Sequence, residues 1–371
     1  MNQTNTDWRT TFDISSVKNE DGILYAFFGA KDNAGNTQVS TSSIKLTIDK
    51  TAPSITVTGF DGNEVASNGT SKTTDSALTF TVKALDTNIS SLSSGNTSVT
   101  LGSEASIDGG KSYTVTVSWN TNANGNVEDS KTVTFTATDA NGRTATKTVT
   151  VACDNSAPVL TLNDYNEYAS SSVELSGTVT DTNFTASSSN LKLYLVPADS
   201  SKETKSGVVT FGSTSDSKTE WTATFTGLEE TSYNIVAVSK DSFGNSSAYR
   251  TGSVAVPSDA GFTGDAIAFA GEAFKVDVNA PELTENSVKI GTSSENASQT
   301  ENFYYNGKSA SIYISSAATD SSSGVKSVVI LPYSKTAVDG IDAAFDSSTG
   351  TFSATVPNEK INKSGTIYAK I

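Results

Sequence analysis

The sequence predicts an all-β protein, a linear array of β-sandwich domains of which two are complete and two are partial. Three observations lead to this prediction. A D-x-x-G motif, an alternating run and a D-x-x-A-P motif follow one another three times. Apolar and polar residues alternate around each copy, which is typical of strands with one buried face. Gly, Ser, Thr and Asn are abundant, and long helical patterns are absent.

The repeated motif pair sets the period of the array. Its copies occupy residues 32–36 with 49–53, 139–143 with 154–158, and 241–245 with 277–281. The prolines that end successive copies, Pro53, Pro158 and Pro281, are 105 and 123 residues apart. A period of that size indicates a string of similar domains rather than one large domain.

Each motif pair predicts an antiparallel hairpin that leads into the next domain. Asp accepts a hydrogen bond from the backbone two residues on and Gly supplies a positive φ, so D-x-x-G favours a tight turn. Before the second turn, Val133, Phe135 and Ala137 alternate with threonines. The proline after each hairpin favours a strand start or a sheet edge and keeps the preceding alanine extended. One domain should therefore pass to the next without a flexible joint.

These junctions divide the chain into four domains. Residues 1–50 are expected to form the C-terminal part of a module. Residues 53–152 and 158–277 are expected to be complete modules, the second with a Gly- and Ala-rich insertion at about 252–274 that is either a loop or a strand extension. Residues 281–371 are expected to form a module that lacks its last strand. Both ends would then cut through a module, as in a piece of a longer protein.

The alternation also predicts the strands of each domain in order. The first partial module should have strands beginning near Trp8 and at 23–28 and 44–48. The expected strands of the two complete modules, besides their closing hairpins, are 55–57, 78–82, 99–101, 113–117, 159–162, 173–179, 191–195 and 221–225. Those of the last module are 312–314, 328–331, 352–356 and 365–371. After the acidic turn at residues 85–88 we expect a Ser- and Gly-rich connection.

Composition argues against several classes of partner and compartment signal. The net charge is −15 and there is no His, which argues against nucleic acid and anionic membranes as partners. No apolar run approaches the roughly 20 residues needed to insert across a membrane, and residues 1–14 contain no apolar signal-peptide core. Cys153 is the only cysteine, so no intrachain disulfide can form. It is either a tethering or redox thiol or, as we favour, a small buried hydrophobe.

The residue pattern gives little support for catalysis. Without His, neither a Ser-His-Asp nor a Cys-His arrangement can form, and there is no G-x-S-x-G elbow or Gly-rich phosphate loop. The acidic turn residues are scattered and give no pair at the separation that glycoside hydrolysis requires. We therefore expect no enzyme, no catalytic residue and no required cofactor.

The turn D-x-x-G-N followed by D-[KN]-[TS]-A-P resembles the tandem bacterial immunoglobulin-like (Ig-like) repeats of large surface or secreted proteins, adhesins above all. The resemblance covers nearly the whole chain, although Arg143 and the pair 278–279 depart from the motif. It implies an extracellular, end-to-end rod of Ig-like sandwiches that acts as a stalk or spacer, with neighbouring modules of the same longer chain as partners. Two alternatives remain open: a module that binds a glycan or a host protein, and the accessory region of a secreted enzyme.

Calcium at the module junctions is the most specific chemical hypothesis. Each junction is expected to gather one carboxylate from its linker, one from the hairpin turn that precedes it, and one from the acidic turn after the second strand of the next module. The candidates are Asp49, Asp154 and Asp277 in the linkers, Asp32, Asp139 and Asp241 in the hairpin turns, and Asp86, Asp181 and Asp320 in the acidic turns. Ca²⁺ prefers about six to eight oxygen ligands, which loops at a sandwich end can supply. The alternative is that these residues only form Asx turns, since no EF-hand loop occurs.

The aromatic residues fall into two groups. Trp8, Phe12, Tyr113, Trp221 and Phe225 lie at strand spacing among apolar neighbours and are expected in the cores. Tyr165, Tyr168, Tyr304 and Tyr305 lie in polar surroundings. They are the candidates for a glycan-binding platform, or are single exposed aromatics that need no functional explanation.

Overall fold

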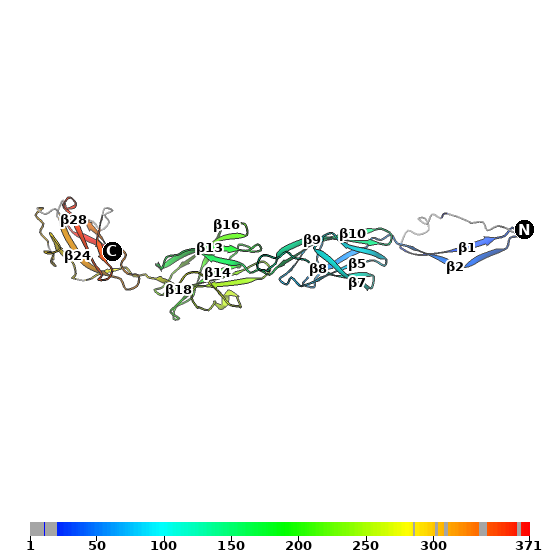
Figure 1. Cartoon of the computed structure of the whole chain (residues 1–371), viewed down its shortest axis with the longest axis horizontal. Helices are drawn as coiled ribbons and strands as arrows, with labels where there is room; N and C mark the ends of the chain where they lie inside the picture. The colour runs from blue at the N-terminus through cyan, green and yellow to red at the C-terminus, as the bar shows by residue number, and fades with distance from the viewer. Residues whose placement is uncertain are drawn as a thin grey trace. The chain divides into compact units, whose positions relative to one another are not determined.

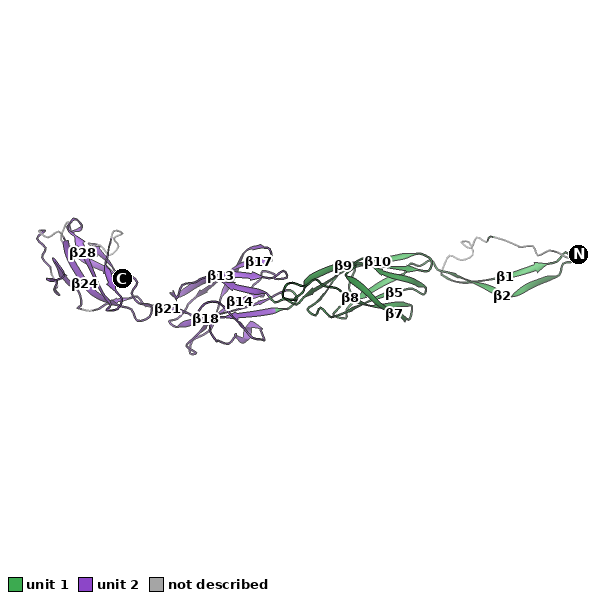
Figure 2. Cartoon of the chain, in the orientation of Figure 1, with its two compact units in different colours: residues 1–157, 242–245 green, residues 158–241, 246–371 purple. Residues whose placement is uncertain are grey.

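A computed structural model describes residues 11, 21–284, 286–300, 303–307, 311–333, 340–361 and 365–371 of the chain (Figure 1). These residues form β-strands and two short 3₁₀ helices, η1 (Ser258–Ala260) and η2 (Asn358–Lys360). They divide into two compact units, unit 1 with residues 1–157 and 242–245, and unit 2 with residues 158–241 and 246–371 (Figure 2). In this part of the chain, no helix has the length and apolarity needed to cross a bilayer.

Unit 1 begins with a two-stranded antiparallel hairpin, β1 (Gly22–Lys31) and β2 (Thr37–Ile48). The D-x-x-G turn between them has the predicted chemistry. Oδ1 of Asp32 accepts the backbone N–H of Ala34 at 2.9 Å, and Gly35 has a φ of 95°. A residue with a side chain would be strained at that φ, which explains the glycine.

A β-sandwich of two four-stranded sheets follows in unit 1. One sheet has the order β3-β5-β8-β7 and the other the order β4-β10-β9-β6. The strands are β3 (Ser54–Thr58), β4 (Thr70–Thr73), β5 (Phe80–Leu85), β6 (Ile89–Ser94), β7 (Val99–Ile107), β8 (Gly110–Val117), β9 (Glu128–Asp139) and β10 (Thr144–Asp154). Neighbouring strands are antiparallel except β4 and β10, which run parallel. We call this the first sandwich.

The two sheets of the first sandwich each bury one face in a shared core. Val133, Phe135 and Ala137 of β9 are at most 1% exposed, as their alternation predicted. The threonines between them lie on the opposite face, where the hydroxyls of Thr134 and Thr148 are 2.8 Å apart across the two strands. Burial of such side chains contributes about 1.5–3 kcal/mol each, so this core dominates the stability of the sandwich.

The second sandwich lies in unit 2 and has the same two-layer plan. One sheet has the order β11-β13-β17-β16, and the other has the order β12-β21-β18-β14-β15, with β19 beside β18 and β20 beside β19. The strands are β11 (Val159–Leu162), β12 (Tyr168–Ala169), β13 (Ser172–Thr180), β14 (Leu191–Pro197), β15 (Lys205–Ser206), β16 (Val208–Ser215), β17 (Lys218–Thr226), β18 (Ser232–Lys240), β19 (Ser246–Arg250), β20 (Ile267–Ala268) and β21 (Phe274–Val276).

The core of the second sandwich is organised around Trp221, which is 1% exposed. Trp221 lies opposite Gly177 of the neighbouring strand β13. A Cβ atom at Gly177 would lie 2.5 Å from the indole ring and would overlap the carbonyl oxygen of Thr161. The glycine therefore makes room for the largest side chain of this core, which confirms that Trp221 is a core residue.

The insertion at residues 252–274 covers the outer face of one sheet of the second sandwich. It contains η1 and β20, and β20 pairs in parallel with β19. Its residues Val254, Val256, Ala260, Phe262 and Ala266 pack on the side of β14 and β18 that faces away from the main core. Most of the insertion is thus a loop that buries a second apolar cluster, and only two residues extend the sheet.

The third sandwich, also in unit 2, has sheets of order β22-β24-β28-β27, with β23 beside β24, and β26-β25-β29. The strands are β22 (Glu282–Leu283), β23 (Lys289–Gly291), β24 (Ser311–Thr319), β25 (Val329–Pro332), β26 (Ile341–Asp342), β27 (Ala344–Asp346), β28 (Thr351–Pro357) and β29 (Ile367–Lys370). Its core includes Ile312, Ile330, Phe352 and Val356. Together, the three sandwiches and the hairpin confirm the predicted array of β-sandwich domains.

Most predicted strands occur near their expected positions, with two differences and one position outside the described residues. The strand expected at 78–82 begins at Phe80 and leaves Leu78 43% exposed. The expected loop after the acidic turn is instead strand β6, whose Ile89 and Leu92 reach the core between serines. Tertiary pairing with β9 overrides the weak strand pattern there. The strand expected near Trp8, and Phe12 with it, lies outside the described residues.

Replacing Phe135 by Ala should lower the free energy of unfolding of the first sandwich by about 3–5 kcal/mol, because it leaves a cavity where a fully buried ring stood. Leu78→Ala is the matched control in the same sandwich and should cost less than about 0.5 kcal/mol, since Leu78 is 43% exposed and lies outside the core cluster. Differential scanning calorimetry, which resolves separate melting transitions, would compare the two. Equal losses would contradict the central position of Phe135.

Candidate metal site

Three of the predicted carboxylates come together in unit 1. Oxygen atoms of Asp49, Asp86 and Asp139 lie within 4.8 Å of one another. Asp49 directly follows β2, Asp86 directly follows β5, and Asp139 is the last residue of β9. The ends of three strands therefore each place one carboxylate at the same point. We call these three residues the Asp49 cluster.

Asp139 is the buried member of the Asp49 cluster, with 2% of its surface exposed. Its Oδ1 accepts the backbone N–H groups of Asn141 and Arg143, both at 2.8 Å, and so forms the turn after β9. Its Oδ2 is buried and has no hydrogen-bond partner among the described residues. A buried carboxylate oxygen without a donor or a cation is costly, so this atom is the strongest sign of a ligand in the cluster.

Asn88 adds an amide group to the Asp49 cluster. Its Nδ2 donates to Oδ2 of Asp49 at 2.6 Å, and its backbone N–H donates to Oδ1 of Asp86 at 3.1 Å. Its Oδ1 is buried, and in the described part of the chain it has no hydrogen-bond partner. Asn141, from the turn after β9, also donates to Oδ2 of Asp49, at 3.3 Å. Two neutral amides thus hold the half-buried carboxylate of Asp49 in place without neutralising it.

The Asp49 cluster concentrates negative charge. Among the described residues, no Lys or Arg forms an ion pair with any of its three carboxylates. At an effective dielectric constant of about 20, two unit charges roughly 5 Å apart repel each other by about 3 kcal/mol. A bound cation would remove this repulsion, and the burial of Asp139 prevents water from doing so.

The oxygen atoms that could act as metal ligands favour a hard cation. The Asp49 cluster offers carboxylate oxygens, Asn88 offers a buried amide oxygen, and neither sulfur nor imidazole is present. Oxygen-only ligand sets suit Ca²⁺ and Mg²⁺, whereas Zn²⁺ and copper prefer sites that include sulfur or imidazole. Ca²⁺ also tolerates irregular geometry and amide oxygens better than Mg²⁺ does. The residues present therefore fit the predicted metal.

The composition of this cluster differs from the expected one at one position. The sequence pattern predicts that Asp32, from the turn that precedes the linker, joins Asp49 and Asp86. Asp32 instead lies at the far end of β1 and β2, ten or more residues from Asp49 along strands that rise about 3.3 Å per residue. Its carboxylate is exposed and accepts hydrogen bonds from Asn36 and Ala34, which lower its pKa. Asp139, from the turn of the following module, takes the place expected for Asp32.

The acidic positions of unit 2 repeat part of this arrangement. Asp181 follows β13 as Asp86 follows β5, and Asp241 follows β18 as Asp139 ends β9. Both are buried, and their carboxylate oxygens lie within 4.8 Å of each other.

In unit 1, Asp154 is fully buried at the end of β10, opposite to the end that holds Asp139, and accepts the N–H of Ser156 at 2.9 Å.

Asp277 and Asp320 are the last two candidates, and hydrogen-bond donors surround both. Oδ2 of Asp277 accepts the N–H of Ser323 at 3.0 Å, and hydrogen bonds from Ser323 and from Asn279 lower its pKa. Oδ1 of Asp320 accepts three backbone N–H groups, those of Ser322, Ser323 and Gly324. Asp241, which was expected here, lies with Asp181 instead. Asp277 and Asp320 thus form Asx turns, which both interpretations of the sequence allow.

Neither Asn88 nor Asn141 is among the site residues that the sequence pattern predicts. A signal was present, because Asp-Thr-Asn occurs at 86–88 and again at 181–183, each directly after the second long strand of a sandwich. The repeat of the asparagine at the same offset indicates a shared role for its side chain. The amide of Asn141 could have been found only from the structure, which brings its turn to Asp49.

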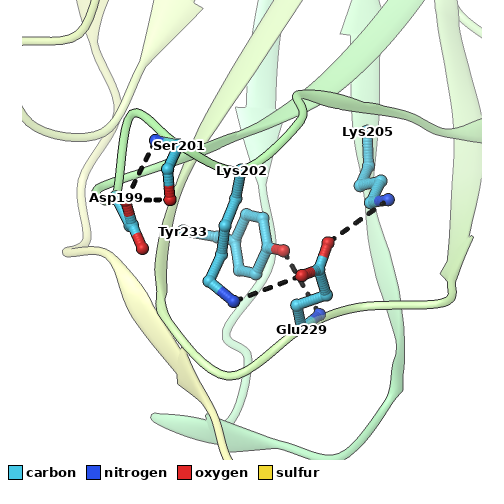
Figure 3. Close-up of polar contacts among 6 residues, drawn as sticks. All are labelled: Asp199, Ser201, Lys202, Lys205, Glu229 and Tyr233. Carbon is cyan, nitrogen blue, oxygen red and sulfur yellow. Dashed lines mark hydrogen bonds and ion pairs between the residues drawn. The ribbon is translucent and has the colours of Figure 1, made fainter.

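A separate set of polar contacts fastens two loops of the second sandwich (Figure 3). Nζ of Lys202 lies 3.2 Å from Oε2 of Glu229, and Nζ of Lys205 lies 4.0 Å from Oε1. The backbone N–H of Glu229 donates to the hydroxyl of Tyr233 at 3.3 Å, and Asp199 closes the neighbouring turn through Ser201. Glu229 is half exposed, so solvent screens these ion pairs and each contributes less than about 1 kcal/mol. They position loops and do not form a catalytic pair.

The candidate glycan-binding aromatics do not form one platform. Tyr165 and Tyr168 line an open cavity of about 520 Å³ in the second sandwich. The ring of Tyr165 packs on Phe274 and its hydroxyl donates to a backbone carbonyl. In the third sandwich Tyr304 is 91% exposed, while the hydroxyl of Tyr305 donates to Asn358 at 3.1 Å.

Cys153 is the second-last residue of strand β10 and is 1% exposed. Burial, followed by the neighbouring charge of Asp154, raises the pKa of its thiol to about 11. The thiol is therefore neutral at physiological pH and packs as a small apolar group, in line with the interpretation that we favoured.

Comparison with known proteins gives no family assignment. No family model matches the chain, and no curated protein matches it. Among solved structures, a tetra-tandem repeat from the extending region of a large adhesion protein is 18% identical, covering 94% of this chain and 76% of that chain, with a TM-score of 0.30. A region of a 1.5-MDa bacterial ice-binding adhesin is 14% identical, covering 84% and 90%, with a TM-score of 0.30.

A third solved structure holds extracellular cadherin domains 1–5 of protocadherin gamma B2. It is 13% identical over 93% of this chain, with a TM-score of 0.31, and this chain spans 60% of its length. Matches at this level do not assign a ligand or an activity to the chain.

A thiol reagent such as DTNB should not react with Cys153 in the native protein at about pH 8, because the side chain is buried and its pKa is raised. In guanidinium chloride the same reagent should label one thiol per chain, which serves as the control. Rapid labelling of the native protein would contradict the buried position and support a tethering or redox role.

Proposed function

We propose that this chain is a non-catalytic structural segment, a stalk or spacer of Ig-like sandwiches in a bacterial surface or secreted adhesin-like protein. An extracellular location and neighbouring modules of the same longer chain as partners are part of this proposal. We also propose that Ca²⁺ bound by the Asp49 cluster stiffens the junction between the β1–β2 hairpin and the first sandwich.

The observation that carries the proposal is the construction of this junction. Only residues 49–53 separate β2 from β3, and hydrogen bonds hold their backbone. Asp21 accepts the N–H of Lys50, and Asp49 accepts the N–H of Thr51 at 3.1 Å. A short linker with hydrogen-bonded backbone suits a spacer, which must hold the parts of a protein at a fixed separation. Modules that must reorient relative to each other need a longer and more flexible linker.

A bound calcium ion would support the spacer role because it would stabilise the junction. Asp49 belongs to the linker, whereas Asp86 and Asp139 belong to the first sandwich. A cation bound by all three carboxylates would connect the linker to the sandwich. The occupancy of this site would be highest where the free calcium concentration is high. At a free concentration 100-fold above its Kd, a ligand that binds only the folded state stabilises it by about 2.7 kcal/mol.

Calcium should therefore raise the melting temperature of the first sandwich relative to a sample in EDTA, and Asp139→Asn should abolish this difference. Asp32→Asn is the matched control, because Asp32 forms the same turn as Asp139 but lies outside the Asp49 cluster. Asn retains the Oδ1 acceptor in both variants, so the turns should persist. Calorimetric melts of the three proteins with and without calcium would make the comparison, and identical melts in all conditions would refute the calcium site.

The stalk proposal is tested separately by small-angle X-ray scattering of the dilute chain. An extended particle, whose maximum dimension does not shrink when calcium is added, is expected of a spacer. A compact particle in calcium would contradict the spacer whether or not the Asp49 cluster binds metal. The two experiments therefore fail independently.

A further inference from the structure

The open cavity beside Tyr165 and Tyr168 lies where the chain crosses between the two sheets of the second sandwich. β11 belongs to one sheet and β12 to the other, and the chain then returns to the first sheet as β13. Residues 164–166, 168–170 and 172–174 line the cavity, which has a volume of about 520 Å³. That volume falls within the range of roughly 300–1,000 Å³ that is typical of sites for small ligands.

The ring of Tyr165 is held rigidly at this cavity. It packs edge-to-face on Phe274, with 6.3 Å between the ring centres, and Phe274 is fully buried in the core. The hydroxyl of Tyr165 donates to the backbone carbonyl of Glu272. A Cβ atom at Gly271 would lie 2.8 Å from this hydroxyl, so the glycine leaves room for it. The cavity therefore has one aromatic wall that is fixed before any ligand binds.

Tyr168 is fixed by its strand and by a cation of the chain itself. It belongs to β12, which pairs in parallel with β21 and places Tyr168 opposite Lys275. Nζ of Lys275 lies 5.3 Å from the centre of the Tyr168 ring and 3.7 Å from Oε1 of Glu167. The ammonium group of Lys275 thus already occupies the position beside the ring that a cationic ligand would take.

The polar side chains of the cavity are not engaged within the protein. Those of Asp164, Asn166, Ser170, Ser172 and Glu174 form no hydrogen bond or ion pair with any other described residue. All five residues are exposed. Two carboxylates, one amide and two hydroxyls are therefore available to a ligand beside two fixed aromatic rings.

We propose that this cavity binds a neutral saccharide, a function beyond that of a spacer. Sugar hydroxyls both donate and accept hydrogen bonds, so they match a mixed set of carboxylate, amide and hydroxyl groups. The C–H faces of sugar rings pack on aromatic side chains. No Lys or Arg lines the cavity, and its two carboxylates would repel a phosphate, a sulfate or an acidic sugar. A cationic ligand would have to compete with Lys275 for Tyr168, which leaves an uncharged sugar as the fitting ligand.

An array of immobilised oligosaccharides incubated with the full chain tests this proposal. The array should hold neutral glucans, galactans and mannans, with sialyllactose and oligogalacturonate as anionic members and chitosan as the cationic one. We expect binding to at least one neutral oligosaccharide and none to the charged members. Isothermal titration calorimetry with the neutral oligosaccharide that binds would then give its affinity for the unchanged chain and for the variants.

Tyr168→Ala and Asp164→Ala should each weaken this binding by about tenfold or more, because the first removes an aromatic wall and the second a charged acceptor. Tyr304→Ala is the control, since Tyr304 is 91% exposed and lies in the third sandwich, and its affinity should be unchanged. Asp164 is exposed and its side chain has no partner among the described residues, so Asp164→Ala should fold normally. It decides the test if Tyr168→Ala melts at a lower temperature.

Three results would overturn the proposal. The first is an array on which no neutral oligosaccharide binds. The second is an affinity that Asp164→Ala and a folded Tyr168→Ala both leave unchanged, which would place any sugar site elsewhere. The third is binding of chitosan or of the anionic members in preference to the neutral ones. Neither substitution touches the Asp49 cluster or a linker, so these results leave the calcium and stalk proposals unaffected.

Discussion

The length of the closing hairpins is the constraint on which the candidate site depends. Strands of ten to twelve residues separate the D-x-x-G turn from the D-x-x-A-P linker, so an antiparallel hairpin sends the two motifs to opposite ends of its module. Asp139 and Asp154 are close in sequence yet lie at opposite ends of β9 and β10. A junction therefore draws its turn carboxylate from the module that follows the linker, which is why Asp139 meets Asp49.

Burial decides which of these carboxylates matters most. Asp32 and Asp139 form the same turn with the same Oδ1 acceptor, but only Asp139 lies at a junction and has an Oδ2 shielded from water. In the exposed turn the side-chain amide of Asn36 donates to Oδ2 of Asp32 at 2.7 Å, whereas in the buried turn Arg143 stands at that position and Oδ2 of Asp139 has no hydrogen-bond partner among the described residues. One motif thus serves as a plain Asx turn in one place and as a candidate metal ligand in another.

The same apolar pattern likewise has different burial in two strands. β2 and β10 share their apolar spacing before the linker, yet the side chains of β10 are buried and two of the three in β2 are exposed. The difference lies in the neighbours, since β10 has strands on both edges and a facing sheet, whereas β2 has β1 alone among the described residues. The insertion of the second sandwich makes a related point, because it covers an outer sheet face with its own apolar residues and so gives that sandwich a second core.

The fold class and most strands follow from the amino-acid sequence alone, because alternation with a period of two reflects burial on one face, and Gly35 and Asp32 encode a turn locally. The sequence also predicts nine acidic positions at the junctions, of which the structure brings Asp49, Asp86 and Asp139 together in unit 1. Tertiary contacts, in contrast, determine which carboxylates meet, that Asn88 and Asn141 join them, and that the serine-rich segment at Ile89 is a strand. Those outcomes depend on contacts between residues tens of positions apart, such as Asp49 with Asn141, and no local pattern specifies such contacts.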